Sequence, residues 1–390
     1  MVNITLFSQI ISRLDRPKFN KLVSAYETDK HNKGYTSWTH LVSMLFCQFA
    51  KSQSVRDISN GLRSATGNLN HLGVKKAPSK SSVSYQNKNR DFNVFKSYYF
   101  SLLESLGQQA GFKQVKFRIK SKIFLLDSTT ISLCLSLFDW AKYKTTKGAV
   151  KLHTLLDYDG NLPAYVNITD GKTADNKGAY DVPLHKGSVI VADRFYNDFS
   201  LLNVWDSNGV FFVVRHKDNL QYTTIKENVL PENRHKNILI DELIELKTPK
   251  SKRTYPKRLR RVAVWDDKNG QVIELITNQM SWTANTISEL YKSRWQIEIF
   301  FREIKQNLHI KSFIGTTENA VMIQIWTALI TILILKGLKA MAKYGWQLSN
   351  LIAFIRLNLF VKINLQDWLD KPFEDHQEIK EKQSIQGILF

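Results

Sequence analysis

The stretch Val189-Ile190-Val191-Ala192-Asp193 places a carboxylate directly after four apolar residues, three of which are β-branched. A short, uninterrupted apolar run of this kind predicts a strand that is buried on both faces of a sheet. The same pattern occurs upstream, where Ile123-Phe124-Leu125-Leu126 precedes Asp127. A carboxylate at the end of a buried strand costs free energy unless a cation, an arginine or a backbone amide compensates it. The two aspartates together are therefore candidate ligands of a divalent ion, while the neighbouring Arg194 offers a purely structural partner.

The segments around these two runs predict the fold class. The turn signal Asp159-Gly160 separates two of the expected strands and predicts a hairpin. The expected strands are 122–135, 149–156, 162–168, 189–192 and 210–214, and the expected helices are 176–182 and 198–205. A hairpin followed by alternating helices and strands predicts an α/β fold with a mixed sheet covered by helices, as in ribonuclease H-like folds.

A β-rich insertion is expected at residues 218–284, where short β-like runs occur at 261–265 and 272–276. The segment from Lys247 to Arg261 contains 8 basic and no acidic residues. Such a run is a candidate contact for DNA phosphates. The alternative is a solvated hairpin whose charges repel one another and stay mobile.

Residues 1–115 are expected to form a helical DNA-binding domain, since they hold 16 basic and only 6 acidic residues. Thr36 and Ser37 are expected to cap one helix, Val55 to Leu62 form a second, and a polar third helix begins near Ser79. The third helix offers side-chain donors to bases or phosphates. The alternative is that it is simply a solvated helix face.

The composition favours a polyanionic partner. The chain has 390 residues, with 55 Lys and Arg against 35 Asp and Glu, and a net charge of +20. An excess of that size promotes binding to nucleic acid through counterion release. Cys47 and Cys134 lie in apolar runs and are expected to be buried free thiols. The apolar run 320–335 is broken by polar residues and is shorter than a membrane span, so we expect a core helix and no membrane partner.

A long helix is expected over 287–308. It carries Tyr291, Arg294, Glu298 and Lys305 at offsets that place all four within about 60° of one face. A glutamate flanked by cations suits a metal-binding carboxylate among phosphate-binding groups. The alternative is an amphipathic helix with ordinary salt bridges.

The spacing Tyr291-x2-Arg294-x3-Glu298-x6-Lys305 resembles the YREK signature of the insertion-sequence-4 family of DDE transposases. The segments that follow Asp127 and Asp193 resemble the first and second catalytic blocks of that family, although Phe195 stands where a glycine is common. The segment 147–153 resembles the family's second strand, and 54–58 and 71–73 resemble the N-terminal domain of one subgroup. The resemblance covers about residues 120–345.

The resemblance implies a role for each matching residue. Asp127, Asp193 and Glu298 would be catalytic and would bind two Mg²⁺ ions, for which Mn²⁺ would substitute. The implied contacts to DNA are Tyr291, Arg294, Trp295, Lys305, Arg194, Lys147 and Lys151. Trp295 stands where the family has an aromatic that stacks on a flipped base, with a core tryptophan as the alternative. An aliphatic pair, Val272-Ile273, occupies the expected region of a second stacking aromatic, which leaves a hairpin excision route open.

The expected organisation is therefore a helical DNA-binding domain (1–115), a catalytic core in two parts (116–217 and 285–373), a β-rich insertion (218–284) and a polar tail (374–390). The implied function is cut-and-paste transposition by a homodimer assembled on terminal inverted repeats and target DNA, in the bacterial cytoplasm near the nucleoid. Two alternatives are a structure-selective nuclease of the same fold and a non-catalytic DNA-binding regulator.

Overall fold

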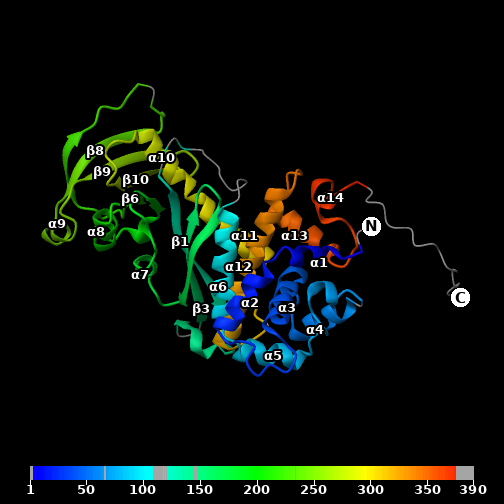
Figure 1. Cartoon of the computed structure of the whole chain (residues 1–390). Helices are drawn as coiled ribbons and strands as arrows, with labels where there is room; N and C mark the ends of the chain where they lie inside the picture. Colours follow the sequence, from blue (N-terminus) through cyan, green and yellow to red (C-terminus); the bar gives the residue numbers. More distant parts are fainter. Residues whose placement is uncertain are drawn as a thin grey trace. The chain divides into compact units, whose positions relative to one another are not determined.

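The computed structural model describes residues 3–65, 67–108, 117, 119, 121–134, 136–144, 147–232 and 234–374. These residues form two compact units. Of these described residues, the helical unit combines those up to residue 108 with those of 303–374, and the sheet unit comprises those between residues 117 and 302. In Figure 1 the strands of the sheet unit fall in the middle of the colour bar, and the helices of the helical unit fall at its two ends.

The described part of the sheet unit contains one mixed sheet of ten strands. The strands are β1 (Ile123–Leu133), β2 (Lys142–Lys144), β3 (Lys147–Asp157), β4 (Leu162–Asp170), β5 (Val189–Ala192), β6 (Phe211–Arg215), β7 (Tyr222–Glu227), β8 (Ile238–Leu246), β9 (Leu259–Asp266) and β10 (Gln271–Thr277). Their order is β2-β3-β1-β5-β6-β10-β9-β8-β7, with β4 paired to β3. This confirms the predicted α/β class with a mixed sheet and helices.

The centre of the sheet combines an antiparallel and a parallel part. β3 is antiparallel to both β1 and β4, whereas β1, β5 and β6 run parallel. All four residues of β5 are fully buried, as its apolar run predicts. The predicted turn joins β3 to β4, and its left-handed residue is Asn161 (φ 48°) rather than Gly160. Asparagine tolerates this conformation better than most residues.

The predicted insertion is β-rich but continues the central sheet. β10 pairs antiparallel with β6, the edge of the parallel part, and β9, β8 and β7 follow outward. The other elements of the sheet unit are η3 (Asp139–Ala141), α7 (Asp175–Ala179), η4 (Arg194–Tyr196), α8 (Phe199–Ser207), α9 (Pro249–Thr254) and α10 (Ala284–Ser293). α11 (Trp295–Asn307) begins in the sheet unit and ends in the helical unit.

The helical unit joins both ends of the chain. Its elements are α1 (Leu6–Ser12), α2 (Arg16–Ala25), α3 (Ser37–Ala50), α4 (Val55–Ser64), η1 (Asn70–Leu72), α5 (Lys80–Asn89), α6 (Asn93–Gly107), α12 (Glu318–Met341), α13 (Leu348–Leu357) and α14 (Leu365–Asp370). α12 packs against α3, α5 and α6. Residues after 302 therefore group with the N-terminal helices, whereas the sequence analysis placed 285–373 with the catalytic core.

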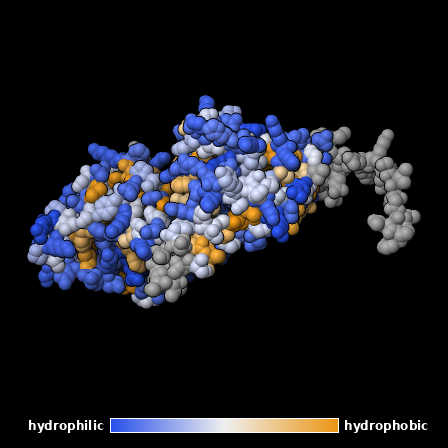
Figure 2. Space-filling model, turned by 90° about the horizontal axis from the view of Figure 1, so that it is seen from below, coloured by the Kyte–Doolittle hydropathy of each residue, from blue (hydrophilic) through white to orange (hydrophobic). Residues whose placement is uncertain are grey.

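α12 is long and apolar enough to cross a membrane by length and composition, yet 83% of its most apolar window is buried inside the protein. Its polar residues are satisfied internally, since the Gln324 amide donates to the carbonyls of His309 and Ser312. This is the pattern of a core helix, as the sequence predicts. Figure 2 shows a face that is mostly hydrophilic, with small hydrophobic patches. Cys47 is buried as expected, but Cys134 is exposed because it follows the last residue of β1.

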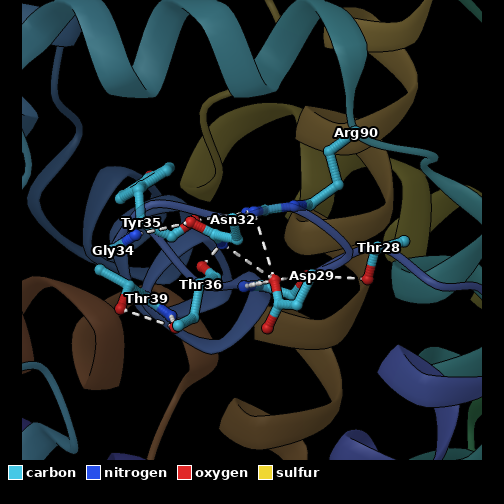
Figure 3. Close-up of polar contacts among 9 residues, drawn as sticks. Thr28, Asp29, Asn32, Gly34, Tyr35, Thr36, Thr39 and Arg90 are labelled. Atoms are coloured by element: carbon cyan, nitrogen blue, oxygen red, sulfur yellow. Dashed lines mark hydrogen bonds and ion pairs between the residues drawn. The ribbon is translucent and has the colours of Figure 1, made fainter.

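A buried arginine fixes the end of α5 to the start of α3 (Figure 3). The Arg90 guanidinium donates to the carbonyl oxygens of Tyr35 (2.7 Å) and Thr36 (3.1 Å) and lies 3.4 Å from Asp29. Its side chain is completely buried. Asp29 in turn accepts from the backbone and the hydroxyl of Ser37, the first residue of α3. One charge network therefore holds the loop before α3 against α5.

Candidate active site

Asp127 and Asp193 lie side by side because their strands are parallel neighbours. The register pairs Leu126 with Ala192, so each aspartate is the next residue along its strand. Adjacent strands are about 4.8 Å apart. Asp127 accepts a hydrogen bond from the backbone N–H of Ser128 (2.7 Å), and Asp193 accepts one from that of Phe195 (2.8 Å). Backbone donors thus orient both carboxylates.

Glu298 reaches this site through a shared arginine. The Arg294 guanidinium donates to Glu298 Oε1 and lies 3.4 Å from Asp127 Oδ2. The side chains of Arg294 and Asp127 are only 16% and 18% exposed, so this contact is shielded from solvent. The arginine therefore lies between the carboxylate from the sheet and the carboxylate from α11.

The predicted single helix over 287–308 is wrong in one respect, because it divides at Arg294. α10 ends at Ser293 and α11 begins at Trp295. The N–H of Arg294 bonds to the carbonyl of Tyr291, and the N–H of Ile297 bonds to that of Arg294. These contacts span three residues instead of the four of an α-helix, so the backbone tightens there. The expected neighbours nevertheless meet, since Arg294 lies 5.9 Å from the ring of Tyr291 and pairs with Glu298.

The site carries more negative than positive charge. The pKa of Asp127 is raised to about 7, chiefly by burial and to a smaller extent by the charges of Asp193 and Glu298, against the opposing effect of Arg294. Burial also raises the pKa of Asp193. A partly buried group of carboxylates with a single arginine among them favours an additional cation.

The donors suit a hard divalent ion in chemistry, because all three are carboxylate oxygens. In the described residues, however, no three His, Cys, Asp or Glu side chains are grouped closely enough to hold one metal ion. The contacts explain this, since the guanidinium of Arg294 occupies the space between Asp127 and Glu298. The three carboxylates therefore converge only in part. Asp127 lies next to Asp193, but Arg294 lies between Asp127 and Glu298.

A fourth carboxylate, which the sequence analysis did not single out, adjoins the site. Asp175, the first residue of α7, accepts hydrogen bonds from the Ser128 hydroxyl (2.5 Å) and the Lys151 ammonium (2.9 Å). Lys151 also donates to the carbonyl oxygen of Thr173 (2.8 Å) and is only 11% exposed. Lys151 was expected to contact DNA, but its ammonium group is engaged inside the protein. Aspartate is common at the start of helices because it stabilises the helix end, so Asp175 does not stand out in the sequence as a candidate site residue.

The remaining predicted DNA contacts lie in varied surroundings. Trp295 is 48% exposed and is not a core residue; the ammonium of Lys268 lies 5.6 Å from its ring. Arg194 is half-exposed and 3.8 Å from Asp218. Lys305 lies in the last turn of α11, within the helical unit. Lys147 begins β3, and its side chain lies outside the described residues.

The basic run from Lys247 to Arg261 is divided between two environments. The last four basic residues of the run are each paired with carboxylates: Lys257 with Asp206, Arg258 with Glu245, Arg260 with Asp241, and Arg261 with Glu242 and Glu274. Arg260 and Arg261 are buried strand residues, so the alternative of a mobile, solvated hairpin is wrong for them. The basic residues that precede them lie at and around α9, whose six residues are all outside the buried core.

Residues 118–334, more than half of the chain, match a family model described as a transposase DDE domain. The chain belongs to this family. Residues 2–75 match a second model, described only as a domain of unknown function. The DDE match contains Asp127, Asp193, Arg294 and Glu298, the residues that form the site.

Several proteins named as transposases resemble the chain over much of its length. A probable transposase for the insertion sequence element IS5377 of Geobacillus stearothermophilus is 29% identical, with 71% of this chain and 72% of the relative covered. The y4zB protein of Sinorhizobium fredii, named as a transposase, is 31% identical, covering 60% of this chain and 66% of the relative. A transposase assigned to the element IS4SA of Synechocystis is 26% identical over 74% of this chain and 80% of the relative. The chain is thus a DNA transposase of the DDE class, related to insertion-sequence enzymes, and this family depends on divalent metal ions.

Proposed function

We propose that this transposase cuts DNA at the ends of its element and joins those ends to target DNA by a cut-and-paste reaction. The carrying observation is that Asp127 and Asp193 directly follow the last paired residues of two adjacent parallel strands, and that Arg294 joins Asp127 to Glu298. We assign these three carboxylates as the catalytic residues and as the ligands of the metal ions.

The strand order supports a ribonuclease H-like core. In the sheet, the hairpin of β3 and β4 lies next to the parallel strands β1, β5 and β6. Asp193 follows the carboxyl end of β5, and Asp127 follows the part of β1 that pairs with β5. In open sheets with parallel strands, sites form at the carboxyl ends of the strands. We propose that residues 218–284 are an extension added to the far edge of this core.

Mg²⁺ is the ion we propose, in two copies, with Mn²⁺ as a substitute. When bound, two such ions activate the attacking water or 3′-hydroxyl and stabilise the leaving 3′-oxygen. The chain contributes three carboxylates, and the amides of Ser128 and Phe195 hold two of them in place. Arg294 balances part of their charge and is also suited to bidentate binding of a phosphate.

We propose that a surface beside the catalytic carboxylates holds the non-transferred strand. We also propose that the chain belongs to the YREK-signature group of insertion-sequence-4 transposases. Tyr291 and Arg294 of the sheet unit would bind phosphates, and the exposed ring of Trp295 would stack on a base. Lys305, in the helical unit, is a separate proposed phosphate contact. Arg194 and Lys147 are further proposed phosphate contacts. The internal bonds of Lys151 to Asp175 and Thr173 favour a role inside the protein over a contact with DNA.

We propose that α5 of the helical unit reads DNA sequence. Its exposed face carries Lys80, Ser84, Tyr85 and Lys88, and the tyrosine is 65% exposed. Residues 58–90 contain six basic and no acidic residues, which matches a polyanionic partner. Serine, lysine and tyrosine are side chains that bind base edges and phosphates.

Polar contacts hold α5 in place where apolar packing is sparse. The side-chain oxygen of Asn87 accepts a hydrogen bond from His40 Nε2 (2.8 Å) on the buried face, and the Asn319 amide donates to the carbonyls of Asn87 (2.9 Å) and Arg90 (2.8 Å). Val83 and Asn87 are the only buried residues of the helix. A rigidly held helix with an open polar face is suited to entry into a DNA groove.

The full assembly that we propose is a homodimer on DNA, because two element ends must be cut and joined. Its partners would be terminal inverted repeats and target DNA, in the cytoplasm beside the nucleoid. The net charge of +20 supports association with DNA at both sites.

The test uses purified full-length protein, a labelled DNA fragment with the element's terminal repeat, and a target plasmid in Mg²⁺. We expect cleavage at the repeat and a joined product on a gel. Asp193→Ala should abolish both products while binding to the repeat persists in a mobility-shift assay. Lys172→Met, an exposed residue in the nearby loop, serves as the matched control and should retain both.

The other functions give different outcomes. Cleavage without joined product would indicate a nuclease, and binding without cleavage by the wild-type protein would indicate a regulator. Unchanged cleavage by Asp193→Ala would contradict the assigned catalytic role.

A further inference from the structure

A partly buried ion pair beside the carboxylates takes no part in the proposed cleavage and joining reactions. Asp175 and Lys151 come from different elements, α7 and β3, and their charged atoms lie 2.9 Å apart. The Lys151 side chain is 11% exposed and the Asp175 side chain 25% exposed. Breaking such a pair by removing one partner leaves a poorly solvated charge. The pair therefore sets the local charge of this part of the sheet unit.

Asp175 is connected to the catalytic strand through Ser128. The Ser128 hydroxyl donates to Asp175, and the Ser128 backbone N–H donates to Asp127 Oδ1. One residue thus couples the two carboxylates. An exchange that loosens Ser128 would also loosen the orientation of Asp127.

A buried tyrosine hydroxyl marks the same place. Tyr196 is 1% exposed. Burial raises the pKa of its hydroxyl, and the charges of Asp127, Asp175 and Asp193 raise it further, whereas the neighbouring side chain of Ser128 lowers it. Within the part of the chain that the structure describes, the hydroxyl meets no partner at good hydrogen-bonding geometry. A buried polar atom among three carboxylates indicates that this space is built for polar or ionic occupants.

We propose that Asp175 and Lys151 form a charge-neutral positioning pair for the metal centre. Asp175 holds Ser128, and with it Asp127, in place. Lys151 cancels the charge of Asp175, so that the divalent ions would meet the three ligand carboxylates and Arg294 without the added negative charge of Asp175. This inference rests on the proposed metal site of Asp127, Asp193 and Glu298.

The proposal predicts opposite effects for the two halves of the pair. Asp175→Asn keeps the hydrogen-bonding shape but leaves the Lys151 charge beside the site, which repels a divalent cation. Lys151→Met leaves the Asp175 charge uncompensated, which attracts one. We expect the first change to weaken Mn²⁺ binding about tenfold and the second to strengthen it by a similar factor, the scale typical for partners of metal ligands.

The double variant Asp175→Asn with Lys151→Met removes both charges and should bring Mn²⁺ affinity back near the wild-type value. Lys151→Arg keeps the charge and should also behave like the wild type. The matched control is Lys172→Met, which removes an exposed lysine from the loop between β4 and α7. A thermal melt in EDTA shows that each variant is folded.

Isothermal titration of the full chain with MnCl₂, without DNA, measures these affinities independently of activity. Opposite shifts that cancel in the double variant support the pair. Weaker binding in both single variants without recovery in the double variant overturns it, because a merely structural role predicts that result. Loss of DNA binding in Lys151→Met with unchanged Mn²⁺ affinity also overturns it, in favour of a phosphate contact.

Asp193→Asn separates this inference from the proposed function. If Asp193→Asn binds Mn²⁺ as well as the wild type, the metal site itself is misassigned. If Asp193→Asn loses the ion but the pair variants do not shift in opposite directions, only the positioning pair fails.

Discussion

The carboxylates of Asp127, Asp193 and Glu298 and the charged residues on β8, β9 and β10 belong to the same unit but are balanced differently. On the outer strands, Arg260 pairs with Asp241, and Arg261 pairs with both Glu242 and Glu274. Burial opposes ionisation of Glu274, yet its hydrogen bonds to Arg261 hold its pKa below the ordinary value. These charges satisfy one another.

In the group of Asp127, Asp193 and Glu298, one arginine contacts two of the three carboxylates. Arg294 contacts Asp127 and Glu298, and the pKa of Asp127 is raised to about 7, chiefly by burial. The carboxylates of the outer strands (the outer cluster) are each paired with an arginine, whereas the proposed catalytic carboxylates retain an excess of negative charge that a bound cation could balance.

The largest effect expected from this difference is on activity. Glu298→Gln should lower cleavage of element ends about 10³-fold or more, the scale of losing a principal catalytic group. Its thermal stability in EDTA should change little. Glu242→Gln is the counterpart in the outer cluster and should lose stability while its folded fraction still cleaves. Equal losses of cleavage per folded molecule would contradict the distinction.

The next effect is on stability. Arg260→Ala leaves Asp241 buried without its partner, and we expect a loss of about 3–5 kcal/mol in the free energy of unfolding, measured by urea denaturation. Asp241 is 7% exposed, so solvent cannot replace the arginine. A loss below about 1 kcal/mol would show that the outer cluster is not a structural network.

A smaller and pH-dependent effect is expected at Asp127. Its pKa lies above the ordinary value of 3.8, so between about pH 4 and pH 7 the unfolded chain releases the proton before the folded chain does. This group therefore lowers stability as pH rises through that range. Asp127→Asn removes the effect and should stabilise the metal-free protein by at least about 1 kcal/mol above pH 7, since one pKa unit corresponds to about 1.4 kcal/mol.

Melting curves in EDTA at pH 5 and pH 8 check this prediction. The advantage of Asp127→Asn over the wild type should be larger at pH 8. An advantage that is equal at the two values, or larger at pH 5, would mean that the buried charge is not the cause.

The smallest effect is expected at an exposed pair of the outer strands. Arg258 donates to Glu245 at 2.9 Å, but the arginine side chain is 56% exposed. Arg258→Ala should cost less than about 1 kcal/mol, as exposed pairs do. If Arg258→Ala lowered the free energy of unfolding as much as Arg260→Ala does, burial could not explain why the two ion pairs differ in their contribution to stability.

Much of the core could be predicted from local sequence. The apolar runs before Asp127 and Asp193 gave the correct strands because burial on both faces requires apolar residues at every position. Thr36, Ser54 and Ser79 cap their helices through side-chain oxygens, as their residue types predict.

The missed elements lack such signals. β7 is largely exposed, and β8 alternates irregularly, with Asp241 and Glu242 buried side by side by arginines from β9. Partners that lie far along the chain decide those positions. The division at Arg294 and the pairing of Lys151 with Asp175 also depend on contacts that residue spacing does not reveal. The neighbouring positions of Asp127 and Asp193 could be predicted because the pattern of each strand is local, whereas the charges that balance them come from residues far along the chain.

The backbone pairing of β6 with β10 has a consequence for engineering. Excising residues 218–284 would not release a detachable module. It would strip the neighbour from a buried, apolar strand and leave a row of open N–H and C=O groups, which is a template for aggregation. A minimal version of this enzyme must therefore keep at least β10, or provide a substitute strand along that border.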